Sequence, residues 1–279
     1  MTFIPTYTLA DGMVVPAIGF GTYKLNGMEG KKAIVQAVHN GYRWLDSAFN
    51  YENEGAVGQA IRECGVPRSE LQITSKLPGR RHRYQEAVQT IQESLWRAQL
   101  EYYDFYLVHW PNPITDLYIE AWQALIEGQK RGYIRSIGVC NFLPEHLDRL
   151  INETGVMPVL NQIELHPYFS QKEQRAYNKK LGILTQSWSP MGRASKVLND
   201  LVIETIAVAH QKTTSQIILR WHVQLGCVPI PKSASETRQR ENLSLFDFEL
   251  SSTDMEKINA LTKENGRLKN QNPAQYEEF

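Results

Sequence analysis

Short apolar runs alternate with amphipathic helical patterns along almost the whole of this 279-residue chain. Eight of the runs have the length of a buried strand, and each is followed by a pattern typical of a helix. Eight such units in about 250 residues are the size of a (β/α)8 barrel. The runs are AIGFG, RWLD, LQITSKL, DFYLVHW, YIRSIGVCN, PVLNQIEL, ILTQSWSP and CVPIPKS.

The intervening segments favour a barrel over an open doubly wound sheet. Residues 83–100 form the strongest helical pattern, with one apolar face made by Ala87, Val88, Ile91, Leu95 and Ala98. A doubly wound sheet normally has fewer strands and a GxGxxG turn after the first one. The only glycine-rich start here, GFGTYKLNG, lacks that spacing.

The two ends of the chain carry separate signals. Ala10-Asp11-Gly12 lies between two apolar runs and predicts a short N-terminal β-hairpin. The segment after Leu261 is polar, and we expect it to form a loop over the surface. No Pro/Ser-rich linker divides the chain, so we expect a single domain over residues 1–279.

Composition excludes several classes of protein. Lys+Arg and Asp+Glu are both 30, so nothing favours nucleic acid or an anionic membrane as a partner. Cys64, Cys140 and Cys227 have no CxxC spacing, which argues against a disulfide scaffold and a structural zinc site. The N-terminus does not resemble a signal peptide, and no apolar run reaches the roughly 18 residues of a spanning helix. We therefore expect a soluble cytoplasmic protein.

Four polar residues stand at or just beyond the ends of three of the apolar runs: Asp46, Tyr51, Lys76 and His109. Because the carboxyl ends of barrel strands converge on one face, we expect these side chains around one pocket. A lysine cation lowers the pKa of a neighbouring tyrosine from its ordinary value of about 10, and an aspartate holds the ammonium in place. With a histidine that binds the substrate oxygen, the set is suited to protonating a carbonyl as it becomes an alkoxide.

Each of these residues also has a purely structural interpretation. Asp46 and Lys76 alone are compatible with an ion pair at the barrel rim, Tyr51 with an ordinary loop tyrosine and His109 with a buried core histidine. Four complementary groups at successive strand ends favour the catalytic interpretation.

The chain resembles the aldo-keto reductase family, and most of all its bacterial branch that includes 2,5-diketo-D-gluconate reductases. The resemblance rests on the four residues above and on GFGTY, LDSAFNYENE, ITSKL, YLVHWP, GVCNF, NQIELHPY, SWSPMGR and IPKSASETRQREN, in the family's order along the whole chain. It implies a (β/α)8 barrel that transfers hydride from NADPH to an aldehyde or ketone. Since members are often monomeric, we also expect a monomer.

The resemblance assigns a role to each matching position. Tyr51 becomes the general acid, Lys76 the residue that lowers its pKa, Asp46 the anchor of Lys76, and His109 the residue that orients the carbonyl. Several other positions are implied to bind the nicotinamide half of the cofactor. They are Asn141 and Gln162 at the carboxamide, Trp188 stacked on the ring, Ser189 and Gly192 along the pyrophosphate, and Thr22 in the cofactor cleft.

The last strand and the short helix after it offer a phosphate site. Lys232, Ser233 and Arg238 combine two cations, a hydroxyl and helix-terminal N–H groups. The resemblance implies that they bind the 2′-phosphate of NADPH, with Glu241 and Asn242 near the adenine. A solvated basic turn is the structural alternative. With the resemblance, we favour NADPH over NADH.

Two positions depart from the usual family pattern. Cys140 replaces a serine, and a thiol is a weaker hydrogen-bond donor, so we expect a looser hold on the carboxamide. Cys140 is also a candidate oxidation site, although a buried, inert thiol is the favoured interpretation. Trp188 replaces a tyrosine and keeps a ring face without the hydroxyl.

Short segments after His109 and at the C-terminus indicate an open pocket for small polar carbonyls. The residues expected to line it are Tyr23, Leu25, Phe49 and Trp110, although packing of the barrel rim remains open for Leu25 and Phe49. Diketo-gluconate, methylglyoxal and other small aldehydes all fit such a pocket, so the sequence does not select the substrate.

Two other functions are alternatives to the reductase. A metal-dependent barrel hydrolase needs clustered ligands, but only His109 and His166 lie near expected strand ends and no HxH pair exists, so we expect no metal. A non-catalytic NADPH-binding subunit that senses redox state or regulates a partner is the second alternative. The four filled catalytic positions favour an enzyme.

Overall fold

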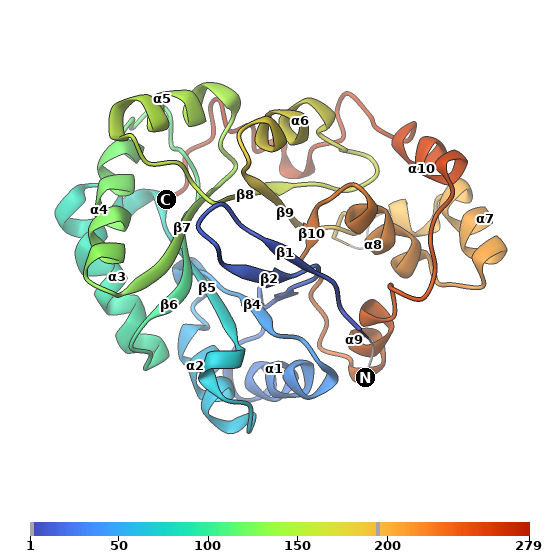
Figure 1. Cartoon of the computed structure of the whole chain (residues 1–279), viewed down its shortest axis with the longest axis horizontal. Coiled ribbons are helices and arrows are strands. Elements are labelled where there is room, and N and C mark those ends of the chain that lie inside the picture. The colour runs from blue at the N-terminus through green and yellow to red at the C-terminus, as the bar shows by residue number, and fades with distance from the viewer. Residues whose placement is uncertain (1–2, 194–195) are drawn as a thin grey trace.

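Parallel strands stand side by side in chain order at the centre of the molecule (Figure 1). They belong to a computed structural model that describes residues 3–193 and 196–279. The described residues form eight strands in this sheet: Phe20–Gly21 (β3), Trp44–Asp46 (β4), Gln72–Leu77 (β5), Tyr103–Val108 (β6), Ile134–Cys140 (β7), Leu160–Glu164 (β8), Leu184–Trp188 (β9) and Val228–Pro229 (β10).

The first and last strands of the sheet meet and close it into a barrel. The N–H of Gly19 donates to the carbonyl oxygen of Pro229 at 3.0 Å, and that of Gly21 donates to Pro231 at 3.1 Å. A Cβ atom at Gly21 would lie 2.9 Å from the carbonyl oxygen of Ile230, so glycine permits this close approach. The predicted (β/α)8 barrel is confirmed.

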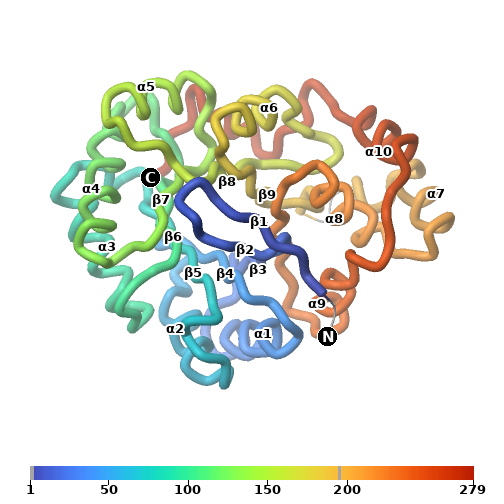
Figure 2. The backbone as a smooth tube through the Cα atoms, viewed as in Figure 1, coloured from blue at the N-terminus to red at the C-terminus, as the bar shows by residue number. Residues whose placement is uncertain are grey.

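Helices surround the barrel (Figure 2). Most of them bury apolar side chains in the core clusters. In the helix over residues 84–98 the predicted face is correct: four of its residues are buried, and Val88 is partly buried. No helix among the described residues is both long and apolar enough to span a membrane. The helices are Gly27–Asn40 (α1), Glu54–Glu63 (α2), Tyr84–Ala98 (α3), Tyr118–Lys130 (α4), Pro144–Thr154 (α5), Lys172–Lys180 (α6), Leu201–His210 (α7), Thr214–Gln224 (α8), Glu236–Leu243 (α9) and Ser252–Asn259 (α10).

The predicted N-terminal hairpin is present and covers one end of the barrel. Thr6–Thr8 (β1) pairs with Val14–Pro16 (β2) in antiparallel register. Leu9 and Val15 pack in one buried cluster with barrel residues that include Trp44 and Phe105. The hydroxyl of Ser136, near the start of β7, donates to Asp11 at 2.5 Å. The hairpin therefore closes the amino-terminal end of the barrel and leaves the carboxyl ends of the strands free for a site.

The C-terminal region differs from the sequence-based expectation. Helix α10 was not predicted, and it starts with a capping box in which Ser251 accepts from the N–H of Asp254 at 3.1 Å. Beyond Leu261 the chain runs from α10 past α6 towards α4 (Figure 2). Glu278 near its end is buried. This segment is thus more than a surface loop, because it packs against the carboxyl ends of the strands.

Candidate active site

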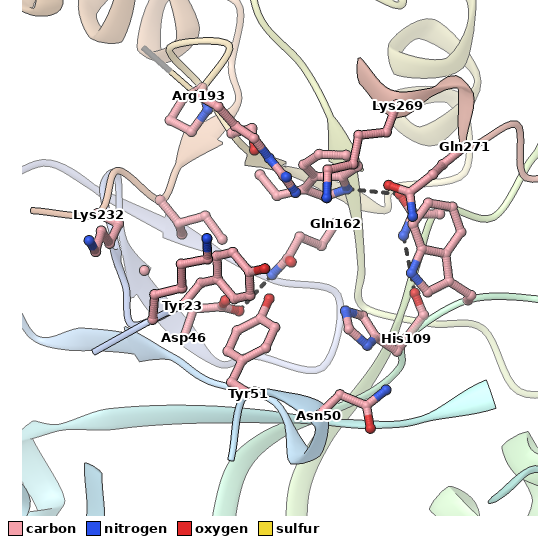
Figure 3. Close-up of a pocket in the computed structure, with 18 of the residues that line it drawn as sticks. Tyr23, Asp46, Asn50, Tyr51, His109, Gln162, Arg193, Lys232, Lys269 and Gln271 are labelled. Carbon is pink, nitrogen blue, oxygen red and sulfur yellow. Dashed lines mark hydrogen bonds between the residues drawn. The ribbon is translucent and has the colours of Figure 1, made fainter. Parts of the chain in front are cut away.

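A cavity of about 660 Å³ opens at the carboxyl ends of the strands (Figure 3). Residues of β3, β4, β6, β7, β8, β9 and β10, or of the loops that follow these strands, contribute to its wall, as does the C-terminal segment. The structure brings ten of the sequence-predicted site residues to this wall: Tyr23, Asp46, Tyr51, His109, Trp110, Asn141, Gln162, Trp188, Ser189 and Lys232.

A buried lysine connects the floor of the cavity to the tyrosine. Lys76 lies on β5 and is fully buried, with its Nζ 2.7 Å from Oδ2 of Asp46 and 2.6 Å from the carbonyl oxygen of Ser47. The same Nζ lies 3.4 Å from the hydroxyl of Tyr51, which ends the short 3₁₀ helix Phe49–Tyr51 after β4. A buried cation needs such partners, and together they aim the ammonium at the phenol.

The electrostatics of this group differ from the sequence-based expectation in one respect. Burial raises the pKa of Tyr51 to about 12, and this effect outweighs the lowering by the Lys76 cation. The predicted lowering by Lys76 is therefore present, but burial determines the net direction of the shift in the tyrosine pKa. Burial also disfavours the charge on Lys76, but the carboxylate of Asp46 keeps the lysine pKa above its ordinary value. At neutral pH the pair is a protonated phenol beside an ammonium, the form that donates a proton.

His109 follows β6 and faces Tyr51 across the cavity floor (Figure 3). The centroids of the two rings are 6.0 Å apart. The Nδ1 atom of His109 lies 2.7 Å from Oε1 of Glu278, a residue of the C-terminal segment. The Nε2 atom is therefore the ring nitrogen that remains available to a molecule in the cavity.

Two amide side chains lie beside the catalytic group. Nε2 of Gln162, on β8, donates to Oδ1 of Asp46 and to Oε1 of Gln186, both at 2.7 Å. Nδ2 of Asn141 donates to the carbonyl oxygen of His109 at 3.1 Å, and its Oδ1 accepts from the indole N–H of Trp188 at 2.8 Å. The tryptophan at this position therefore holds one of the amides.

The chemistry of these amides fits a carboxamide. Gln162 retains Oε1 as an acceptor without a partner among the described residues, and Asn141 retains one N–H of its Nδ2 group. One acceptor and one donor are the complement of the N–H and C=O of a nicotinamide. The backbone supports this interpretation, because Asn141 (φ 63°) and Ser189 (φ 49°) adopt left-handed conformations directly after β7 and β9. Strained non-glycine residues concentrate at functional sites.

The comparisons with known proteins agree with this geometry. The sequence pattern of the Aldo/keto reductase family matches residues 17–263. The chain belongs to the aldo/keto reductase family. It is 48% identical over 279 residues to 2,5-diketo-D-gluconic acid reductase B of a Corynebacterium species, with 100% of both chains covered. It is 43% identical to methylglyoxal reductase DkgA of Yersinia pestis, with 94% of both chains covered.

The fold is also similar to that of a solved structure. The crystal structure of an aldo-keto reductase of Bombyx mori in complex with NADP superimposes with a TM-score of 0.91 at 32% identity, covering 100% of this chain and 99% of that one. The predicted family is therefore confirmed. Among the described residues of this aldo/keto reductase, no group of three or more His, Cys, Asp or Glu is placed to hold a metal ion.

Three residues expected at the cavity lie elsewhere. Thr22 is fully buried, and its hydroxyl donates to the carbonyl oxygen of Asp46 at 2.9 Å. Its side chain therefore binds the end of β4 and does not face the cofactor cleft. Leu25 belongs to the buried cluster between the barrel and its helices. Phe49 is buried under the guanidinium of Arg97, which lies 3.9 Å from the ring centroid. For Leu25 and Phe49 the packing interpretation is correct.

Of the residues expected at the pyrophosphate and the adenosine half, Ser189 and Lys232 line the cavity and the other five do not. Gly192 follows the cavity residue Met191 and has a left-handed backbone (φ 56°). Ser233 is buried and accepts from the N–H of Ser235, and Arg238 is exposed on the first turn of α9. Glu241 accepts from the hydroxyl of Thr213, and Asn242 is buried; both lie further along α9.

Cys140 does not contribute to the wall of the cavity. It is fully buried in the apolar cluster with Trp44 and Phe105, and burial raises its pKa well above the ordinary range. Among the described residues the amides of Gln162 and Asn141 have partners other than this thiol, and the looser hold on the carboxamide stays a prediction. The inert-thiol interpretation fits this environment.

Sequence reasoning missed much of the cavity rim. Lys24 and Arg193 lie beside the ring of Tyr23, with their charged groups 5.6 and 5.8 Å from its centroid. The C-terminal segment adds Lys269, Gln271, Tyr276 and Glu278 to the wall. Tyr276 packs on Trp110 with ring centroids 4.4 Å apart. The aromatic and charged residues near the C-terminus were the one sequence feature that could have indicated this part of the wall. They do not indicate where the segment folds back.

Proposed function

We propose that the protein reduces small polar aldehydes and ketones to alcohols with NADPH as the cofactor. The observation that carries the proposal is the Tyr51 hydroxyl, held 3.4 Å from the Lys76 ammonium on the cavity floor and facing His109 (Figure 3). A protonated phenol next to a fixed cation is a general acid for an oxygen that gains negative charge.

Each residue of the group has a defined task in this reaction. NADPH supplies the hydride when it is bound. Tyr51 gives its proton to the carbonyl oxygen, and Lys76 stabilises the phenolate that this leaves behind. Asp46 fixes the ammonium of Lys76, and His109 donates a hydrogen bond that orients the carbonyl.

The cofactor-binding residues follow from the same arrangement. Asn141 and Gln162 hold the carboxamide, and the ring of Trp188 stacks on the nicotinamide. Further residues bind the remainder of the cofactor: Ser189, Gly192, Lys232, Ser233 and Arg238 at its phosphates, and Glu241 and Asn242 near the adenine. The N-terminus of α9, capped by Ser235, adds N–H groups close to Arg238.

The rim supports a substrate that carries negative charge or many hydroxyl groups. Lys24, Arg193 and Lys269 reach the cavity and make no ion pair among the described residues. Relatives of this chain are named for diketo-gluconic acid, an anion at neutral pH, and for methylglyoxal. We propose these two kinds of carbonyl as the first substrates to compare, and a cytoplasmic monomer as the working form.

The test is consumption of NADPH by the purified protein with a panel of small carbonyls, measured for the wild type and for Tyr51→Phe. Removal of one hydroxyl leaves the ring contacts of Tyr51 with Tyr23 and His109 in place. We expect turnover to fall by at least about a hundredfold, the effect of losing a general acid, while NADPH still binds. No turnover by the wild type with any carbonyl, despite NADPH binding, would favour a sensing or regulatory subunit.

A further inference from the structure

A fully buried glutamine lies on the short helix that follows the last strand of the barrel. Gln239 belongs to α9, which lies beside α1 (Figure 1). Its side chain is 0% exposed, whereas the neighbouring Arg238 and Arg240 are exposed. A buried amide costs free energy unless its donors and its acceptor find partners. The partners of Gln239 therefore show which parts of the molecule it holds together.

Both N–H groups and the oxygen of this side-chain amide have partners. Nε2 donates to the carbonyl oxygens of Ala33 on α1 and of Ser233, both at 3.0 Å. Oε1 accepts from Nδ2 of Asn40 at 2.9 Å. The backbone carbonyl oxygen of Gln239 accepts from the hydroxyl of Tyr42 at 3.2 Å. Gln239 thus connects α1 to the turn between β10 and α9.

The bond to Ser233 fixes the orientation of one peptide group in that turn. Among the described residues, Gln239 is the only donor to the carbonyl oxygen of Ser233. The N–H of a trans peptide points away from its C=O, so the N–H of Ala234 points away from the buried amide. Ala234 is exposed, and its N–H has no acceptor in the described part of the chain. One buried side chain therefore directs a free backbone donor away from the core.

The same turn carries the cations proposed to bind the 2′-phosphate. Lys232 lines the cavity, and Arg238 is exposed on the first turn of α9. Neither of them makes an ion pair with another described residue. Two cations and a free N–H at one turn suit a phosphate, whose oxygens accept several hydrogen bonds.

We propose that Gln239 is a positioning residue for the choice of cofactor. It holds the peptide between Ser233 and Ala234 in the orientation that presents its N–H to the 2′-phosphate of NADPH. This inference rests on the proposed function, in which this turn binds that phosphate. NADH lacks the phosphate, so a turn that has lost this restraint should bind NADPH more weakly and NADH as before.

The first test is a fluorescence titration of NADPH and of NADH with the wild type, Gln239→Met and Gln174→Met. Methionine has a similar length and lacks both donors. Gln174 is a matched control, because it is also a buried helical glutamine but lies on α6 and donates to Asn178. We expect Q239M to weaken NADPH binding by about tenfold, the effect of one hydrogen bond to a charged group, with NADH binding unchanged. Q174M should leave both affinities unchanged.

The outcomes separate the role of Gln239 from a purely structural one. Equal losses of NADPH and NADH affinity in Q239M, or an unchanged NADPH affinity, overturn the inference. A wild type that prefers NADPH keeps the proposed phosphate site in either case. A wild type that binds NADH as tightly as NADPH refutes the phosphate site itself, and the inference with it.

The second test uses the wild type, so it does not depend on the folding of Q239M. ¹⁵N–¹H spectra of alanine-labelled protein follow the N–H of Ala234, and Ala234→Ser identifies its signal. We expect this signal to move on addition of NADP⁺ and to move much less with NAD⁺, because only NADP⁺ brings a phosphate to the turn. Equal movement with the two cofactors, or none with NADP⁺, contradicts the proposed orientation of the peptide.

Discussion

Replacing Lys76 by Met should be among the most destabilising single changes near the active site. Lys76 and Asp46 are 0% and 2% exposed, and their charged atoms are 2.7 Å apart. Met fills a similar volume but leaves the Asp46 carboxylate buried with Gln162 as its remaining side-chain partner. Removing one member of a buried pair costs about 3–5 kcal/mol. For a protein of this size, that lowers the melting temperature by about 6–10 °C, since each kcal/mol corresponds to about 2 °C.

The assay is thermal unfolding followed by circular dichroism, with two comparison variants. Lys32→Met removes a lysine from a pair of similar length, 2.9 Å to Glu29, whose members are 63% and 84% exposed. That change should shift the melting temperature by at most about 2 °C, because exposed pairs contribute about 1 kcal/mol or less. Adding Asp46→Asn to Lys76→Met removes the uncompensated charge and should restore part of the loss. Equal shifts for Lys76→Met and Lys32→Met, or a double variant less stable than the single one, refute the reasoning.

Three further predictions concern other groups. Burial raises the pKa of Glu54, whose Oε1 accepts from Ser75 at 2.5 Å and whose Oε2 has no partner among the described residues. The wild type should therefore lose stability as pH rises above the unfolded carboxyl pKa of about 4.3. Glu54→Gln should therefore gain melting temperature relative to the wild type between about pH 5 and pH 7.5, and a constant difference contradicts this. Arg238→Ala should weaken NADPH binding in a fluorescence titration by about tenfold and leave NADH binding nearly unchanged, because only NADPH carries the 2′-phosphate; equal losses remove the phosphate role. All three cysteines are free and buried, so an aromatic disulfide reagent should label none in the native protein within minutes and all after unfolding.

The barrel could be predicted from the sequence because each of its strands and helices has a local sequence pattern. Each strand is a short apolar run with a helix pattern beside it, and the catalytic residues stand at the ends of those runs, where the topology forces them together. Helix α10 has few apolar residues, chiefly Met255 and Ile258, so its periodicity is too weak to detect. The helix depends on its Ser251 cap and on packing that the sequence does not display.

The sequence did not predict which way loop side chains point, or which residues far apart in the chain come into contact. Thr22 and Tyr23 are neighbours, yet Thr22 bonds to β4 and Tyr23 lines the cavity. The order of residues in a loop does not determine which way each side chain points. Glu278 is 169 residues from His109, so no local pattern indicates that they meet. The net rise in the pKa of Tyr51 was not predicted, because the extent of burial is a property of the packed structure.

The carboxylate of Asp46 joins two sites through a single group. Oδ2 binds the ammonium that supports Tyr51, and Oδ1 binds the amide proposed to hold the cofactor. Coupling between two sites through a shared group is reciprocal: a ligand at one strengthens binding at the other by the factor with which it is itself strengthened. Deprotonation of Tyr51 and cofactor binding should therefore affect each other by one common factor, and a variant of Asp46 that changes this factor in one direction should change it equally in the other.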